Sequence, residues 1–258
     1  GFDSHHPLHL HPARGDSDRM NADPRFFRVA ALASVLSALT TLLLIFLPNL
    51  FDPAPDFEAR MARIQEGAYV LRSWVYLLHP FLVFTAALGV ALAVGKQAPV
   101  FAIAGMAGFT LWAFNEAGQQ TLTLFAFDRW RVACTGADET LREAIRVNAL
   151  MYDGIWDAMY MLLLIGFAIG NACLGLALIA GGRLASVAGG FMLAACVLTV
   201  LLFMGQIGVT LLPQPVLEWA YPAIQPLGRL TIGVWLWRVA GGGLSRVFST
   251  VLSHMHTK

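Results

Sequence analysis

Long apolar blocks joined by short polar connections make up most of this 258-residue chain. Each block is long enough for a helix to cross about 30 Å of hydrocarbon, which takes roughly 20 residues. The pattern therefore predicts an all-α protein, a polytopic membrane bundle of six transmembrane helices. We place the six spans at about 26–48, 68–94, 99–127, 152–180, 184–212 and 217–240.

The segments that flank these blocks are polar. Residues 1–25 place four histidines among prolines and are expected to form a disordered leader, with Met20 as a candidate natural start. A metal site in this tract is the alternative to plain disorder. Residues 241–258 are expected to be a short cytoplasmic tail, so that 26–240 form one membrane domain without a separate soluble catalytic domain.

Composition excludes one class of function. Hydrophobic residues make up 57% of the chain and charged residues 13%, about half the charged share of a soluble domain. The formal net charge is +1, and no basic stripe with interleaved aromatics is present, which excludes nucleic-acid binding. The three cysteines show no CxxC or metal-binding spacing. Only Cys134 lies outside the predicted spans, so no disulfide is expected within the chain.

Lysine and arginine in the short turns predict the orientation, because cytoplasmic loops are enriched in these residues. With the N-terminus inside, the inner turns around Lys96 and Arg183 contain no acidic residue, whereas the outer connections mix arginines with acids. We therefore expect a multi-pass protein of a bacterial cytoplasmic (inner) membrane, with both termini inside.

The longest outer connection precedes the fourth span. Residues 138–150 begin with a helix start signal at Asp138 and repeat apolar residues on one face. They are predicted to form an amphipathic helix that runs into the span, with a bend expected at Gly154. A position on the membrane surface and a lid over an outer cavity are the two alternatives for its role.

Small residues spaced four apart predict where the helices touch. Gly166 and Gly170 form a GxxxG pair in the fourth span, and Ala104 and Gly108 share this spacing in the third. Such pairs allow two helix backbones to approach closely in lipid. They predict packing and carry no information about chemistry.

The third span carries the strongest functional signal. Asn115 and Gln119, and likewise Glu116 and Gln120, lie four residues apart, and Trp112 precedes Glu116 by the same spacing. A carboxylate in hydrocarbon costs several kcal/mol unless it faces protein, water or a partner charge. This polar face must therefore point into the bundle or into an aqueous cavity.

The other spans offer partners for this face. The second span holds Arg72 and His79, seven residues apart, and the sixth holds Arg229 after a proline-rich stretch at 222–228 that is expected to break the helix. In the predicted topology all of these residues lie at mid-depth or in the outer half. The predicted polar layer consists of His79, Trp112, Asn115, Glu116, Gln119, Gln120, Asp153, Trp156, Asp157, Gln206 and Arg229.

Several functions are compatible with such a layer. The first is a non-catalytic site for a small or lipidic ligand, and the second is an accessory subunit of a membrane complex, whose polar residues only fix helix register. A metalloenzyme that uses His79, Glu116 and Asp157, or a proton-coupled transporter, comes third, because HExxH and inverted-repeat patterns are both missing. The expected partners are the bilayer, a lipid or small hydrophobic ligand, and other membrane subunits; the sequence indicates no particular cofactor.

Three stretches carry a family resemblance. They are 139–144 leading to Asp153 and Asp157, 170–189 with its inner turn, and 224–230 before 234–237. In spacing and hydropathy the chain resembles a bacterial six-span integral membrane family catalogued only as a domain of unknown function. The resemblance implies six helices and a cytoplasmic-membrane location, and it implies no activity or site residue.

Overall fold

The computed structural model describes residues 23–209 and 211–241. Within these ranges every regular element is helical and no strand is present. The order of the elements is α1 (Pro24–Phe46), η1 (Leu47–Leu50), α2 (Phe57–Ala62), η2 (Arg63–Gln65), α3 (Gly67–Val94), α4 (Pro99–Leu122), the π-helical segment η3 (Thr123–Phe127), α5 (Asp128–Cys134), α6 (Glu139–Ile179), α7 (Arg183–Gln206) and α8 (Gln214–Gly241).

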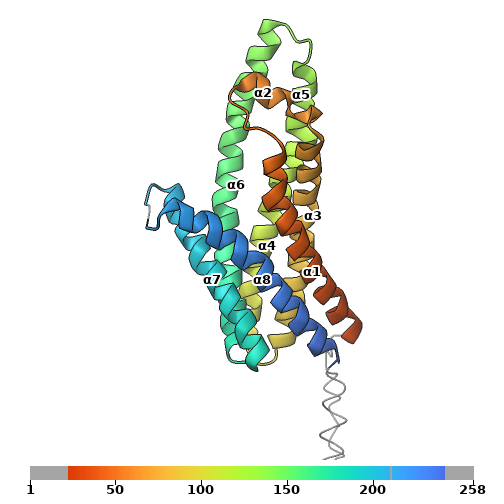
Figure 1. The fold of residues 1–258 in the computed structure, drawn as a ribbon, viewed down its shortest axis with the longest axis vertical. Coiled ribbons are helices and arrows are strands. Elements are labelled where there is room, and N and C mark those ends of the chain that lie inside the picture. The colour runs from red at the N-terminus through yellow and green to blue at the C-terminus, as the bar shows by residue number, and fades with distance from the viewer. Residues whose placement is uncertain (1–22, 210, 242–258) are drawn as a thin grey trace, which may run out of the picture.

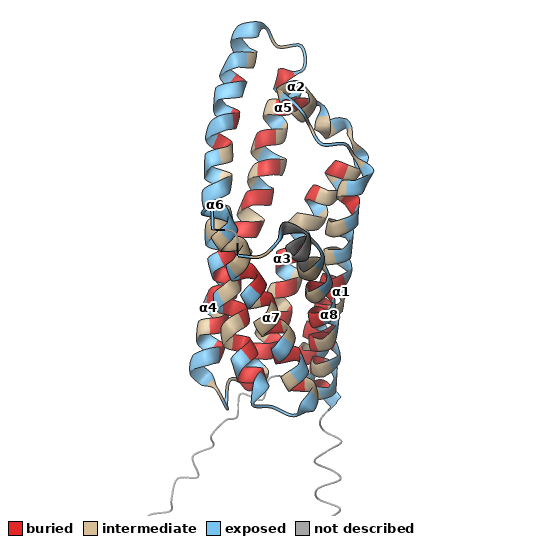
Figure 2. Cartoon of the chain, turned by 60° about the vertical axis from the view of Figure 1, so that its left-hand side comes forward, coloured by how far each residue is buried: buried red, intermediate tan, exposed pale blue. Residues whose placement is uncertain are grey.

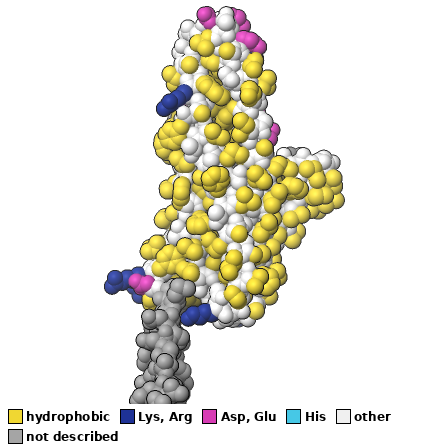
Figure 3. All heavy atoms as spheres, turned by 180° about the vertical axis from the view of Figure 1, so that it is seen from behind, with side chains coloured by type: hydrophobic (Ala, Val, Ile, Leu, Met, Phe, Trp, Pro, Cys, Tyr) yellow, Lys and Arg dark blue, Asp and Glu magenta, His cyan; other side chains and the backbone are white. Residues whose placement is uncertain are grey.

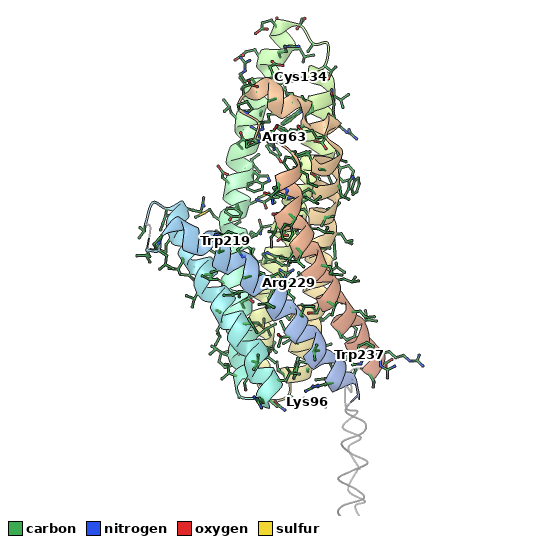
Figure 4. The ribbon with its side chains drawn as sticks, viewed as in Figure 1. Arg63, Lys96, Cys134, Trp219, Arg229 and Trp237 are labelled. Atoms are coloured by element: carbon green, nitrogen blue, oxygen red, sulfur yellow. The ribbon has the colours of Figure 1, made fainter. Side chains whose placement is uncertain are left out.

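Six long helices pack as a closed ring at one end of the molecule and as an open one at the other (Figure 1). The packing neighbours run α1–α3, α3–α4, α4–α6, α6–α7, α7–α8 and α8–α1. The basal end holds the start of α1, the end of α8 and the turn with Lys96, and the distal end holds α2, α5 and the start of α6 (Figures 1 and 4). Because α7 and α8 cover only the basal half, α1 and α6 have no helix between them in the distal half.

The described helices confirm the all-helical fold, and their length and composition support a membrane protein. Five segments are long and apolar enough to cross a membrane: Pro24–Leu50, Gly67–Val94, Pro99–Cys134, Glu139–Ile179 and Arg183–Gln206. The sixth predicted span corresponds to α8, a helix of 28 residues, which does not reach the same combination of length and hydropathy over its described residues.

Apolar side chains also cover the outside of the bundle. Phe46, Ile103 and Phe114 are all more than 60% exposed, and buried residues form a stripe on the inner side of each long helix (Figure 2). Hydrophobic side chains cover most of the face seen in Figure 3, with most of the acidic groups at the distal end and most of the basic ones at the basal end. So apolar an exterior is unusual for a soluble fold and suits a lipid environment.

Several predicted boundaries are corrected. The third span continues as one helical rod from α4 through η3 to Cys134, and the fifth ends at Gln206 instead of 212. The predicted break at 222–228 is wrong, because α8 runs through Pro222 and Pro226 without interruption. Nearly all of the predicted leader and tail lie outside the described residues.

The predicted helix before the fourth span is confirmed. The Asp138 side chain accepts a hydrogen bond of 2.8 Å from the Leu141 backbone N–H and caps the N-terminus of α6. From Glu139 the helix continues for 41 residues, without a break at Gly154. The segment therefore extends α6 toward the distal end as part of the same rod.

Glycines set the closest helix crossing, between α4 and α6. A Cβ atom added at Gly108 would lie 2.5 Å from the backbone nitrogen of Gly170, and one added at Gly166 would lie 2.7 Å from the backbone nitrogen of Trp112. Neither neighbour is a flexible side chain, so neither can move aside cheaply. The sequence prediction of close packing at these glycines is confirmed.

Gly166→Ala should therefore destabilise the bundle by about 1–3 kcal/mol, the usual cost of overpacking. The measurement is the free energy of unfolding in mixed micelles. Gly190→Ala is the matched control, because a Cβ at this exposed position on α7 meets open space, and alanine favours a helix over glycine by about 1 kcal/mol. Equal effects of the two substitutions would contradict the assigned crossing.

Candidate functional site

A cavity of about 330 Å³ lies among α1, α3, α4, α6 and α8, and we call it the inner cavity. Its wall combines aromatic rings with polar and charged groups, the mixture that is typical of small-molecule sites. The lining residues are Thr41, Leu44, Ile45, Arg72, Tyr76, His79, Trp112, Glu116, Gln119, Gln120, Trp156, Tyr160, Leu163, Leu164, Phe167, Pro222, Gln225 and Arg229.

Helix geometry gives the depth of this cavity. Glu116 lies 17 residues beyond the basal residue Pro99 of α4, which is about 26 Å at 1.5 Å per residue. His79 lies 15 residues before the basal residue Val94 of α3, or about 23 Å. The cavity therefore lies about 23–26 Å along the helices from the basal end of the bundle.

A chain of hydrogen bonds connects α8, α3 and α1 beside the cavity. Arg229 Nη1 lies 2.6 Å from His79 Nε2, and His79 Nδ1 lies 2.7 Å from Thr40 Oγ1. A guanidinium only donates, so His79 Nε2 accepts and its proton is on Nδ1, which donates to Thr40. The Thr40 hydroxyl in turn donates to the carbonyl oxygen of Ser37 at 3.0 Å.

Arg229 is also bound to its own helix and to α1, and it lies midway along α8 on the side that faces the bundle (Figure 4). Its Nη1 donates to the Ser37 carbonyl and its Nη2 to Gln225 Oε1, both at 3.4 Å. The Ser34 hydroxyl donates to the Arg229 carbonyl at 2.7 Å. We call Arg229, His79, Thr40, Ser37 and Ser34 the Arg229 network.

Two polar groups on the cavity wall lack a hydrogen-bond partner among the described residues. Glu116 is 7% exposed, and its carboxyl group makes no hydrogen bond or ion pair with a described residue, although it interacts electrostatically with Arg229 at longer range. Gln225 Nε2 is a buried donor without an acceptor. Arg229 fixes the orientation of this amide, because a flipped amide would direct N–H groups at the guanidinium.

The other polar residues of α4 behave differently from Glu116. Gln119 Nε2 donates to the carbonyl of Trp156 at 2.8 Å and joins α4 to α6. Asn115 Nδ2 donates to the carbonyl of Leu111 in its own helix at 2.8 Å, and Asn115 does not line the cavity. Asn115 is thus a buried polar residue whose hydrogen bond stays within its own helix.

Aromatic rings complete the wall. The Trp156 and Tyr160 rings stack with centroids 5.6 Å apart and planes 19° apart. Trp112 meets His79 edge to face at 6.2 Å. Flat, rigid surfaces of this kind suit a ligand that has a planar or apolar part.

A second, wider cavity of about 590 Å³ lies toward the distal end, and we call it the outer cavity. It shares Arg72, Gln120 and Trp156 with the inner cavity, so the two adjoin. Its lining residues are Pro53, Ala54, Arg60, Arg63, Tyr69, Arg72, Ser73, Gln120, Thr123, Phe127, Arg131, Tyr152, Asp153, Trp156 and Asp157. Thr123 and Phe127 come from the π-helical segment η3, a geometry frequent at functional sites.

Ion pairs brace the wall of the outer cavity. Arg60 of α2 binds Asp153 of α6 through both guanidinium Nη groups, one of them at 2.8 Å from Oδ2. This hydrogen bond raises the pKa of Arg60, which is charged in any case. Arg131 pairs with Asp128 and donates to the Tyr69 hydroxyl at 2.9 Å.

The structure divides the predicted polar layer into two chambers. His79, Trp112, Glu116, Gln119 and Arg229 line the inner cavity and not the outer one, Asp153 and Asp157 line the outer one and not the inner one, and Gln120 and Trp156 line both. Asn115 lines neither, and Gln206 is exposed at the end of α7. The predicted residues therefore do not all line one chamber, although the two chambers adjoin at Arg72, Gln120 and Trp156.

Some cavity residues are missing from the sequence-based set. Tyr76 follows Arg72 by four residues, Tyr160 follows Trp156 by four, and Gln225 precedes Arg229 by four. Each therefore shares a helix face with a recognised polar or aromatic position, and this spacing was the signal that would have found them.

The proposed metal ligands do not come together. Within the described ranges no group of three or more His, Cys, Asp or Glu residues is placed to hold a metal ion. Both ring nitrogens of His79 are already hydrogen-bonded, and Asp157 is exposed in the other cavity. His79, Glu116 and Asp157 are thus not a metal site in this structure.

Comparison with known proteins adds no identity. No protein-family model matches the chain, and no curated protein or solved structure is significantly similar to it. The resemblance to a six-span family therefore stays a prediction.

Thr40→Val tests the Arg229 network. Valine keeps the shape but removes the acceptor for the His79 N–H, so the buried imidazole loses a partner and the bundle should lose about 1–3 kcal/mol. The free energy of unfolding in micelles is the measurement. Thr110→Val is the control, since the exposed Thr110 bonds only to its own helix and should change stability by less than about 0.5 kcal/mol. Indistinguishable values would mean that the network does not hold the helices together.

Proposed function

We propose that this chain is a membrane protein whose inner cavity binds a small or lipidic ligand without reacting with it. The observation that carries the proposal is a pair of polar groups on the wall of a 330 Å³ cavity. The Glu116 carboxyl group makes no hydrogen bond or ion pair with a described residue, and Gln225 Nε2 is a buried donor without an acceptor. A buried polar group without a partner costs about 1–3 kcal/mol. A ligand that accepts from Gln225 and donates to Glu116 would recover this cost.

The wall is built to hold such a ligand in one orientation. The Arg229 network holds the α1–α3–α8 side, and the Gln119 hydrogen bond to Trp156 holds the α4–α6 side. A preformed wall lowers the entropy cost of binding. His79 has its ring nitrogens occupied on both sides, so its role in this proposal is structural.

The second candidate is an accessory subunit of a membrane complex, and the Arg229 network is the observation that favours it. Its hydrogen bonds join three helices that are distant in sequence, which fixes their register. Interhelical hydrogen bonds in membranes contribute only about 0.6–2 kcal/mol each, so they specify geometry more than they stabilise. This role leaves Glu116 and Gln225 without explanation, and we rank it second.

For the membrane arrangement we propose six spans with both termini in the cytoplasm of a bacterial cell. The start of α1 and the end of α8 lie at the same end of the bundle, which requires an even number of crossings (Figure 1). The 28 residues of α8 reach about 42 Å, enough to cross. Lys96 and Arg183 at the basal turns support a cytoplasmic location for that end.

Cysteine accessibility tests this arrangement. In a background with all three native cysteines replaced by alanine, Lys96→Cys should be labelled by a membrane-impermeant maleimide only after the cells are opened. Glu143→Cys, at the distal end, should be labelled in intact cells. The opposite result would reverse the topology, and labelling of both positions in intact cells would exclude the six-span arrangement.

Native mass spectrometry tests the binding proposal. Protein extracted in mild detergent should carry a bound small molecule or lipid, and Glu116→Gln should reduce its occupancy. We expect an affinity loss of about tenfold or more, because one carboxyl oxygen is replaced by an amide NH2 that cannot accept a hydrogen bond. Glu143→Gln is the control, because Glu143 is exposed and pairs with Arg146 far from the inner cavity. If no bound species is found, or if both variants keep it equally, the inner cavity is not a binding site that uses Glu116.

A further inference from the structure

The outer cavity has an excess of positive charge. Four arginines line it, Arg60, Arg63, Arg72 and Arg131, against two aspartates. Arg60 is paired with Asp153, and Arg131 is paired with Asp128. The charges of Arg63 and Arg72 are thus the ones that no ion pair among the described residues compensates.

Arg63 is held in place by its neighbours, and one of its N–H donors has no acceptor among the described residues. Its Nη2 donates to the Asp52 carbonyl at 2.8 Å, and its Cζ lies 5.2 Å from the centre of the Phe51 ring and 5.7 Å from that of Tyr69. Its Nε is buried and has no acceptor among the described residues. Arg63 lies between α2 and α3 near the distal end (Figure 4), so its guanidinium is oriented before any ligand arrives.

Arg72 shows the same combination at the junction of the two cavities. Its Cζ lies 4.8 Å from the centre of the Tyr76 ring, and its Nε is buried without an acceptor. The acids closest in the chain or on the wall do not compensate it, since neither Glu66 nor Asp157 forms an ion pair with any described residue. Two buried arginine donors on one cavity wall therefore lack acceptors.

From this arrangement we propose that the outer cavity is an anion-binding site in which Arg63 and Arg72 hold a phosphate or carboxylate group. An anion supplies acceptors to both Nε groups and neutralises both charges. Guanidinium groups suit this task, because their planar donors bind carboxylate and phosphate oxygens in pairs.

The site differs from the one in the inner cavity. Its charged contacts come from η2 and from the first turns of α3, whereas Glu116 and Gln225 belong to α4 and α8. Arg72 nevertheless lines both cavities, so an anion held there would lie at the entrance to the inner one. A free anion and the head group of an anionic lipid share this chemistry.

Two titrations distinguish these sources. Inorganic phosphate is titrated into the full chain in a non-ionic detergent and followed by calorimetry, and binding of phosphatidic acid against phosphatidylcholine is followed by native mass spectrometry. We expect wild type to bind phosphate, phosphatidic acid or both, and Arg63→Gln and Arg72→Gln to weaken that binding at least about tenfold. Phosphate binding identifies a free anion as the ligand class, and binding of phosphatidic acid alone identifies a lipid head group.

Arg129→Gln is the matched control. It removes the same charge from the exposed face of α5 without touching the cavity lining, so binding should stay as in wild type. If Arg72→Gln does not fold, Arg72→Lys keeps the charge but loses the paired donors and should still weaken binding.

Absence of binding by both probes, or equal weakening by Arg63→Gln and Arg129→Gln, would overturn the proposal. Glu116→Gln separates the two sites. If it leaves anion binding unchanged while the species of the inner cavity is lost, both proposals stand. Loss of anion binding in Glu116→Gln would instead mean that the outer cavity is not an independent anion site.

Discussion

Hydrocarbon offers no hydrogen-bond partner, and this constraint decides where every polar side chain of the bundle goes. Arg229 and His79 lie roughly 20 Å from the basal end and are buried, each providing what the other needs: the guanidinium donates and the neutral imidazole accepts. Thr40 accepts a hydrogen bond from His79 and donates one to the Ser37 carbonyl, which extends the chain of hydrogen bonds into α1. The apolar exterior of the molecule and the pairing of its buried polar groups both follow from it.

The different lengths of the helices separate the inner cavity from the outer cavity. α7 and α8 close the ring only in the basal half, while the rod of α4, η3 and α5 and the 41-residue α6 extend well beyond them (Figure 1). The inner cavity forms where α8 still covers the bundle, and the outer one forms beyond it, under α2. Ion pairs such as Arg60–Asp153 occur in the outer chamber, where charged groups at helix ends reach water.

Sequence reasoning located the inner cavity well and the outer one poorly. Glu116, Gln120 and Trp112 were found because polar residues at helical spacing in a long apolar block are conspicuous. Asp153 was assigned to the same layer as Glu116. Its partner Arg60 lies on the short helix α2, which the pattern of apolar residues did not predict. Gln206 was misplaced for a related reason: α7 ends there, and its side chain is exposed.

By itself the sequence determined that this is a helical membrane protein and that one face of the third span must point inward, because composition and spacing along a single helix are enough for both. Only the tertiary structure decided that Arg229 binds His79 and that Glu116 faces a cavity without an ion pair. Which side chains on different helices meet depends on how the helices cross. The close approach of α4 and α6 at Gly108 and Gly166 sets one of these crossings. A single sequence records the depth of a residue approximately and does not record its neighbours on other helices.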